Sequence, residues 1–107
     1  MESQELFENA VRIKIVGVGG AGNNAVDRIR MDMEQLDGLT LSCVNTDLKT
    51  LSDSIVGETH LIGRNITRGL GTGGDPELGR KAAESDRETI TRLVDGFELI
   101  FIVASLG

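Results

Sequence analysis

Aromatic residues are scarce in this 107-residue chain, which contains three Phe and neither Trp nor Tyr. Proteins that hold single-stranded nucleic acids usually stack the bases on such rings, so the composition argues against that role. The formal net charge of −6 argues against it as well, because nucleic-acid binding depends on a basic surface. No nucleic-acid partner is therefore expected. A small nucleotide is not excluded, since backbone amides can bind its phosphates.

Cysteine and proline occur once each, as Cys43 and Pro76. A single cysteine cannot form an internal disulfide, which favours a reducing, cytoplasmic location. No cationic start precedes an apolar block, and no apolar stretch approaches the roughly 20 residues that span a bilayer. The sequence therefore predicts no direct insertion into a membrane. Glycine, present 14 times, is left as the main source of tight turns.

Apolar segments alternate with helix-like segments along the chain. We expect strands at residues 10–18, 39–44, 59–62 and 97–103. We expect helices after the first glycine-rich turn, at 48–54, and at 76–94 with a bend near Ser85. The polar, acidic residues 1–9 are expected to form a flexible lead-in, and 63–75 a long loop. The alternation predicts an α/β fold in one unit, 1–107: a partial doubly wound, Rossmann-like parallel sheet with strand order 3-2-1-4.

The first glycine-rich turn, residues 17–24, reads GVGGAGNN and joins a predicted strand to a predicted helix. Gly17, Gly19 and Gly22 match the G-x-G-x-x-G fingerprint of dinucleotide-binding folds. In that fingerprint the glycines allow a tight turn, close approach to a pyrophosphate and close helix packing. Asp47 follows the second strand, where an acid that binds ribose would lie. The fingerprint alone fits a dinucleotide site, but it equally fits glycines that serve packing only.

The second glycine-rich turn, residues 68–76, reads RGLGTGGDP and opens another predicted helix. Pro76 suits the first helical position, and Asp75 suits the N-cap before it. Exposed amides at a helix start, with the helix dipole behind them, favour anions. Two such turns at one sheet edge could surround a chain of phosphates from two sides. A dinucleotide fold does not need the second turn, so the pair favours a nucleotide polyphosphate.

Four segments together resemble the FtsZ family of tubulin-like cell-division GTPases. They are 13–26 (IKIVGVGGAGNNAV), 44–47 (VNTD), 67–84 (TRGLGTGGDPELGRKAAE) and 101–107 (FIVASLG), the last being similar to the strand before the family's GGGTGTG signature. The resemblance extends over nearly the whole chain and keeps the order and spacing of the motifs. It implies the GTP-binding portion of a GTPase that self-associates into filaments and works with other division proteins.

The resemblance implies GTP or GDP as the ligand, with Mg²⁺ accompanying the nucleotide in the intact protein. The first turn would contact the α- and β-phosphates or support that contact, residues 45–47 would line the phosphate and metal side, and 72–74 would face the γ-phosphate. The family commonly has asparagine where this chain has Asp75, and we expect this acid to cap the helix. The implied nucleotide-binding residues are Gly19, Gly20, Ala21, Gly22, Asn23, Asn24, Asn45, Thr46, Asp47, Gly71, Thr72, Gly73, Gly74 and Gly107.

The resemblance also implies that the chain is the amino-terminal part of a nucleotide-binding domain. In the family, the signature loop, the guanine-contacting segment and the second domain that positions the attacking water follow the residue matching Gly107. We therefore expect no catalytic residue and no protein metal ligand in this chain, and GTPase activity only in the intact protein with a neighbouring subunit. A dinucleotide-binding module and a non-catalytic fragment that joins filaments remain alternatives. His60 and Cys43 are expected to be structural.

Overall fold

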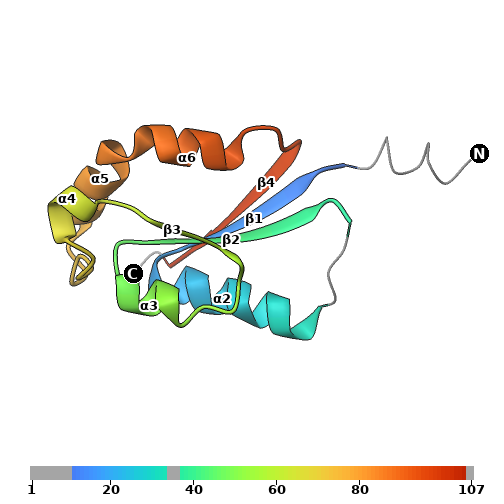
Figure 1. The fold of residues 1–107 in the computed structure, drawn as a ribbon, viewed down its shortest axis with the longest axis horizontal. Helices are drawn as coiled ribbons and strands as arrows, with labels where there is room; N and C mark the ends of the chain where they lie inside the picture. The colour runs from blue at the N-terminus through green and yellow to red at the C-terminus, as the bar shows by residue number, and fades with distance from the viewer. Residues whose placement is uncertain (1–10, 34–36, 106–107) are drawn as a thin grey trace, which may run out of the picture.

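The computed structural model describes residues 11–33 and 37–105 of the chain (Figure 1). Four parallel strands form one sheet with the order β3-β2-β1-β4. Their bounds are β1 (Ile13–Val18), β2 (Leu39–Asn45), β3 (Glu58–Leu61) and β4 (Leu99–Ala104). This arrangement confirms the predicted α/β class and strand order 3-2-1-4. The predicted lead-in, residues 1–9, lies outside the described residues.

Helices cover both faces of the sheet (Figure 1). One face carries α2 and α3, and the other carries α5 and α6, with the short α4 beside α5. Right-handed crossovers place α2 and α3 on one face as the chain moves from β1 through β2 to β3, and place α4, α5 and α6 on the other face as it returns across the sheet to β4. None of the helices in the described ranges has the length and apolar character needed to cross a bilayer. The helix bounds are α2 (Gly19–Asp32), α3 (Leu48–Ser52), α4 (Arg64–Thr67), α5 (Pro76–Ser85) and α6 (Arg87–Val94).

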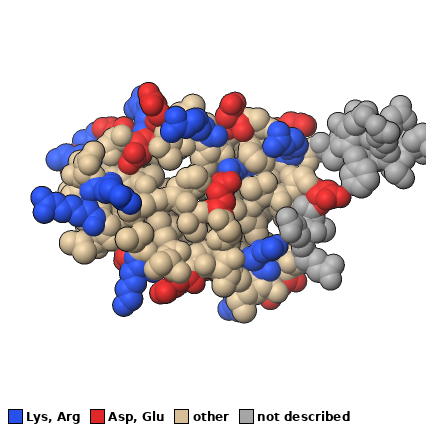
Figure 2. All heavy atoms as spheres, in the orientation of Figure 1, with Lys and Arg blue, Asp and Glu red and all other residues tan. Residues whose placement is uncertain are grey.

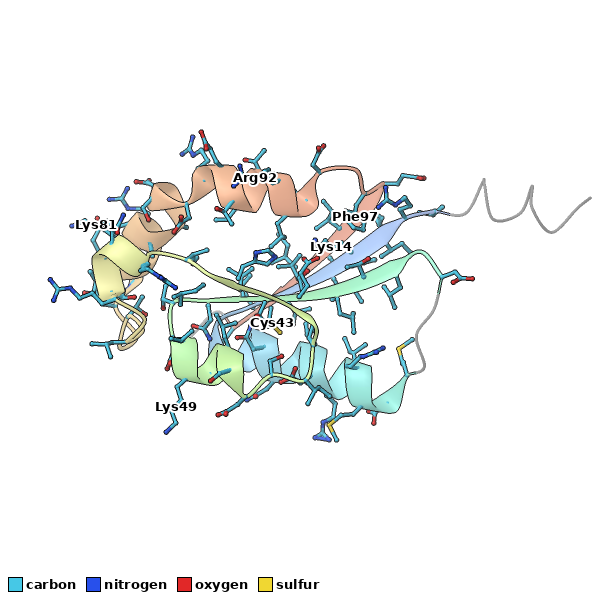
Figure 3. The ribbon with its side chains drawn as sticks, viewed as in Figure 1. Lys14, Cys43, Lys49, Lys81, Arg92 and Phe97 are labelled. Carbon is cyan, nitrogen blue, oxygen red and sulfur yellow. The ribbon has the colours of Figure 1, made fainter. Side chains whose placement is uncertain are left out.

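Two apolar cores lie on opposite faces of the sheet, because neighbouring side chains of a strand point in opposite directions. The core under α6 contains Val16, Val44, Ile62 and Leu93. The core under α2 and α3 contains Val26, Cys43, Leu51 and Val56. Cys43 is 0% exposed, which agrees with the structural role expected for it, and Figure 3 shows it between the sheet and α2.

The helices differ in three details from the sequence-based expectation. The first helix, α2, begins at Gly19, inside the glycine turn. Part of the expected loop 63–75 is helical, as α4. The predicted bend near Ser85 is a complete break at Asp86, whose backbone leaves the helical region at φ −119°. There the Asp86 carboxylate accepts a hydrogen bond from the Gly63 N–H at 2.6 Å, so a tertiary contact holds the break in place.

The strand register brings the segments that follow β1, β2 and β4 to one edge of the sheet. Val18, the last residue of β1, pairs with Val44 of β2 and with Ala104 of β4. The segments that follow these strands therefore emerge side by side, at the left in Figure 1.

In Figure 2 the charged side chains of both signs lie mainly over the helices above and below the sheet.

Candidate functional site

A cleft of about 660 Å³ lies at the carboxyl edge of the sheet. Its walls are the turn from β1 into α2, the segment after β2, the second glycine-rich turn with the start of α5, and the end of β4. The structure thus brings the two glycine-rich turns, about fifty residues apart in sequence, into one cavity. The predicted binding residues that line it are Gly19, Gly20, Ala21, Asn45, Thr46, Asp47, Gly71, Thr72, Gly73 and Gly74.

The remaining predicted residues do not line the cleft in the described part of the chain. Gly22 and Asn23 are buried near the start of α2, a position that suits support of the glycine-rich turn. Asn24 is exposed on the same helix. Gly107 lies outside the described residues.

Backbone packing explains two glycines of the first turn. A Cβ added at Gly17 would lie 2.3 Å from the carbonyl oxygen of Gly22, and one at Gly22 would lie 2.3 Å from the carbonyl oxygen of Val103. Both distances are far below van der Waals contact, so only glycine lets α2 approach β1 and β4 this closely. The approach directs the amino terminus of α2 at the cleft, because Gly19 to Ala21 form its first turn and line the cavity.

The amino terminus of α2 has no side-chain cap. Its N-cap residue is the apolar Val18, and its first turn contains no acidic residue. By contrast, Asp47 caps α3 by accepting hydrogen bonds from the N–H groups of Lys49 and Thr50, at 3.0 and 3.4 Å. Since no side chain caps the first turn of α2, its backbone N–H groups can serve an external acceptor. The dipole of this 14-residue helix makes an anion the favoured one.

The start of α5 forms the opposite wall of the cleft. Pro76 occupies its first turn, and the Asp75 carboxylate accepts a hydrogen bond from the Glu77 N–H at 2.9 Å. The predicted N-cap is therefore confirmed. Asp75 thus has a structural role as the helix cap. Without such a partner, a carboxylate at this wall would repel a phosphate.

The second glycine-rich turn is held in place by the segment that follows β2. The Gly71 N–H donates to the Thr46 carbonyl at 3.1 Å, and the Leu48 N–H donates to the Gly69 carbonyl at 2.9 Å. The Thr67 hydroxyl also donates to the Thr46 carbonyl, at 3.2 Å. Left-handed backbone at Gly71, with φ of 85°, reverses the chain here and strongly favours glycine. Two walls of the cleft are thereby joined backbone to backbone.

The described lining of the cleft contains two acids, Asp47 and Asp75, and no Lys, Arg or His. Lys49 on α3 lies in sequence between the lining residues Asp47 and Thr50, but its side chain points away from the body of the molecule in Figure 3. Within residues 11–33 and 37–105, no group of three or more His, Cys, Asp or Glu side chains is arranged to hold a metal ion. A phosphate chain here would rely on amides and helix dipoles, and a divalent cation would be bound largely by the phosphates themselves.

Several lining residues were not predicted from the sequence. Gly79 and Ala83 lie four apart on α5, and their small side chains leave room for the cavity. That spacing of small residues, one turn after Pro76, is a signal that could have identified them. Four others lie within segments that the sequence analysis had singled out: Val18, Leu70, Ala104 and Ser105. Thr50 and Ile62 reach the cleft through tertiary contacts alone.

A separate polar cluster lies between the sheet and α6, on the far side from α2. The buried Lys14 ammonium is 2.6 Å from the Glu58 carboxylate and donates to the Leu93 carbonyl at 2.6 Å. It also lies 4.8 Å from the centre of the Phe97 ring, and Figure 3 shows both side chains beneath α6. His60 Nε2 is 3.3 Å from the same carboxylate, which gives the histidine a partner outside the cleft.

This cluster also sets the ionisation of Glu58. Burial by itself opposes the charged form of this carboxyl. Hydrogen bonds from Lys14, Ser42 and His60, together with the Lys14 charge, outweigh that effect and lower the Glu58 pKa. The cluster therefore holds an ionised Glu58 between β1, β3 and α6.

Comparison with known proteins places this geometry in a family. The profile of the Tubulin/FtsZ family, GTPase domain, matches residues 12–107. The cell division protein FtsZ of Buchnera aphidicola subsp. Schizaphis graminum is 47% identical over 106 residues, which are 99% of this chain and 27% of the relative. The chain thus spans just over a quarter of the length of this curated relative.

Solved structures give the same result. An FtsZ dimer from M. jannaschii superimposes with a TM-score of 0.88 at 36% identity, over 97% of this chain and 30% of that chain. CetZ2 from Haloferax volcanii, solved as a GTPγS-bound protofilament, has a TM-score of 0.70 at 34% identity, over 91% of this chain and 31% of that chain. By sequence and by fold, this chain belongs to the tubulin/FtsZ family and forms part of its GTPase domain.

Proposed function

We propose that this chain is the phosphate-binding part of the GTP site of a filament-forming cell-division GTPase. The observation that carries the proposal is the uncapped amino terminus of α2, which faces the second glycine-rich turn across one cleft. An α/β sheet binds ligands at the carboxyl ends of its strands, which is where this cleft lies. The GTPγS-bound protofilament of CetZ2 supports a guanine nucleotide as the ligand.

Different walls of the cleft would bind different phosphates of the nucleotide. The first turn, Gly19 to Ala21, would bind the α- and β-phosphates with its amides, and Gly71 to Gly74 would face the γ-phosphate. Asn45 to Asp47 lie between them and would border a Mg²⁺ ion carried by the nucleotide. The ion would neutralise phosphate charge that no cation of the described lining offsets.

The second glycine-rich turn favours this reading over a dinucleotide module. It lines the same cavity as the first turn, and its backbone is fixed to the segment after β2. A dinucleotide needs amides at one turn only, whereas a triphosphate can be held from two sides. Equilibrium titrations of the chain with GTP and with NAD distinguish the two: the proposal expects GTP to bind more tightly.

Hydrolysis is expected to need more than this chain. The chain spans 27% of the FtsZ relative, and we propose that the remaining parts and a neighbouring subunit supply the groups that position water. Self-association into filaments, contact with other division proteins and a cytoplasmic location belong to the same proposal. The purified chain should release no phosphate from GTP above background in a phosphate-release assay. Sustained turnover would contradict this division of labour.

Placing a carboxylate in the first turn tests the phosphate site. Ala21→Asp, in the intact protein that contains this chain, should abolish GTP binding in calorimetry, because the new charge would face the phosphates. Met31→Asp is the matched control: it adds the same charge to the same helix at a position 71% exposed and outside the cleft. If both variants bind GTP as the unmodified protein does at matched salt, the phosphates do not lie at this turn.

A further inference from the structure

The buried amide of Asn23 joins two walls of the cleft. Asn23 is 1% exposed and is the fifth residue of α2. Its Nδ2 donates to the Gly17 carbonyl at 2.9 Å and to the Val44 carbonyl at 3.2 Å. Its Oδ1 accepts from Asn45 Nδ2 at 3.0 Å. Both amide hydrogens and the oxygen of Asn23 are thus used to hold the first turn against β1 and β2.

Asn45 extends this hydrogen-bond network to the segment after β2. Its Oδ1 accepts from the N–H groups of Thr46 and Asp47, at 2.8 and 3.1 Å. Both N–H groups therefore point back at a side chain, and the turn they form is fixed before any ligand arrives. The same turn presents the Thr46 carbonyl to the Gly71 N–H, at 3.1 Å, in the second glycine-rich turn.

These bonds form one continuous path from the first turn to the second, through Asn23, Asn45 and the Thr46 backbone. We propose that Asn23 is a positioning residue of the nucleotide site, which holds the three phosphate-facing segments at a fixed spacing without touching the ligand. This inference rests on the proposed function. This positioning role has a consequence for affinity, because a triphosphate must contact both glycine-rich turns at once, while a diphosphate depends mainly on the first. The spacing that Asn23 sets should therefore contribute more to the affinity for GTP than to the affinity for GDP.

The residue type fits this role. Two carbonyl oxygens and one amide nitrogen surround the Asn23 side chain, so it must offer two donors and one acceptor. A carboxamide offers these groups in one plane, whereas aspartate would place an oxygen against the two carbonyls. Alanine would remove all three hydrogen bonds and leave Asn45 to find another orientation.

Amide hydrogen exchange on the 107-residue chain, without nucleotide, tests the path directly. In Asn23→Ala we expect the amides of Thr46, Asp47 and Gly71 to exchange about tenfold faster. The control is Val26→Ala, one turn later on α2 and 0% exposed, which loses packing but no hydrogen bond of the path. Rates are compared after correction for global stability, measured by urea unfolding. If the three amides exchange alike in the two variants, the path does not hold the turns and the proposal is overturned.

Titrations with GTP and GDP, followed by chemical-shift changes, test the consequence. Asn23→Ala should weaken GTP binding several-fold more than GDP binding, whereas Val26→Ala should weaken both by the same factor. An unchanged GTP-to-GDP ratio in Asn23→Ala would overturn the positioning role. If the unmodified chain binds neither nucleotide, the proposed function fails for this chain, and the exchange experiment still decides the role of Asn23. If Asn23→Ala does not fold, Asn23→Ser, which can satisfy one of the two carbonyls, is measured with the same criteria.

Discussion

The glycines of the first turn serve different purposes, which the structure separates residue by residue. Gly17 and Gly22 sit where backbone atoms of neighbouring segments leave no room for a side chain. A Cβ at Gly20, by contrast, would meet nothing within 4 Å. Gly17 and Gly22 are therefore required by the fold itself, whereas the opening at Gly20 leaves space on the cleft side for a ligand.

Replacing Gly22 with alanine should destabilise the chain. The new methyl would press on the Val103 carbonyl, and relief requires α2 to move away from β4. We expect the free energy of unfolding to fall by about 1–3 kcal/mol, the range for overpacked sites, in urea denaturation. Gly20→Ala is the control and should leave stability unchanged or slightly higher, since alanine favours helix over glycine. Equal unfolding midpoints for the two variants would contradict the packing argument.

At the scale of the elements, the Lys14–Glu58 pair joins β1 to β3, and the Lys14–Leu93 hydrogen bond adds α6. Only Lys14 is buried in this pair, so losing Glu58 would leave a buried ammonium without its counter-charge, while the partly exposed carboxylate keeps the effect moderate. The pair also lies on the opposite side of the sheet from α2. It therefore stabilises the α6 face independently of the glycine turns.

The lowered pKa of Glu58 makes this contribution dependent on pH. A carboxyl with a lower pKa in the folded state stabilises the fold above its unfolded pKa, about 4.3, and loses that effect as the pH falls through the folded value. The Glu58 side chain is 37% exposed, so solvent screening limits the effect to about 1 kcal/mol. Urea unfolding between pH 7 and pH 3 should show the unmodified chain more stable than Glu58→Gln at pH 7, with the gap narrowing below about pH 4.3. A gap that is constant with pH would contradict the ionised pair.

At the scale of the whole molecule, the two edges of the sheet differ in character. The β3 edge is four residues long and carries Glu58, Thr59 and His60. The β4 edge is six residues long and apolar, and its residues Phe101 and Ile102 are 50% and 67% exposed. Within the described residues, β4 pairs with β1 only. An apolar strand with one free edge is a template for pairing with another chain.

The 107-residue chain by itself should therefore associate through β4. Light scattering over a range of concentrations should show dimers or larger species. Ile102→Lys should reduce them, because a charge on an edge strand opposes pairing. Met31→Lys, a change of the same kind at a position on α2 that is 71% exposed, should not. A chain that stays monomeric at high concentration would contradict this prediction.

Local patterns in the sequence determined the elements and their order. The glycine turn after an apolar strand, the Asp75 cap before Pro76 and the alternation of strands with helices all act over a few residues, so they can be read without the fold. The right-handed crossover rule then leaves few ways to order four parallel strands, and 3-2-1-4 is the one observed. Convergence of the two glycine turns also follows, because parallel strands end at the same edge.

Only the tertiary structure decided which residues face the cleft and which lie behind it. The family resemblance implied that Asn23 contacts the phosphates or supports the turn, and the structure buries it, with its amide donating to the Gly17 and Val44 carbonyls. Lys14 meets Glu58 across 44 positions of sequence, and Ile62 reaches the cavity although it follows the end of β3 by only one residue. These outcomes depend on strand register and on the close approach of backbones. Such contacts form between segments far apart in the chain, and no local pattern encodes them.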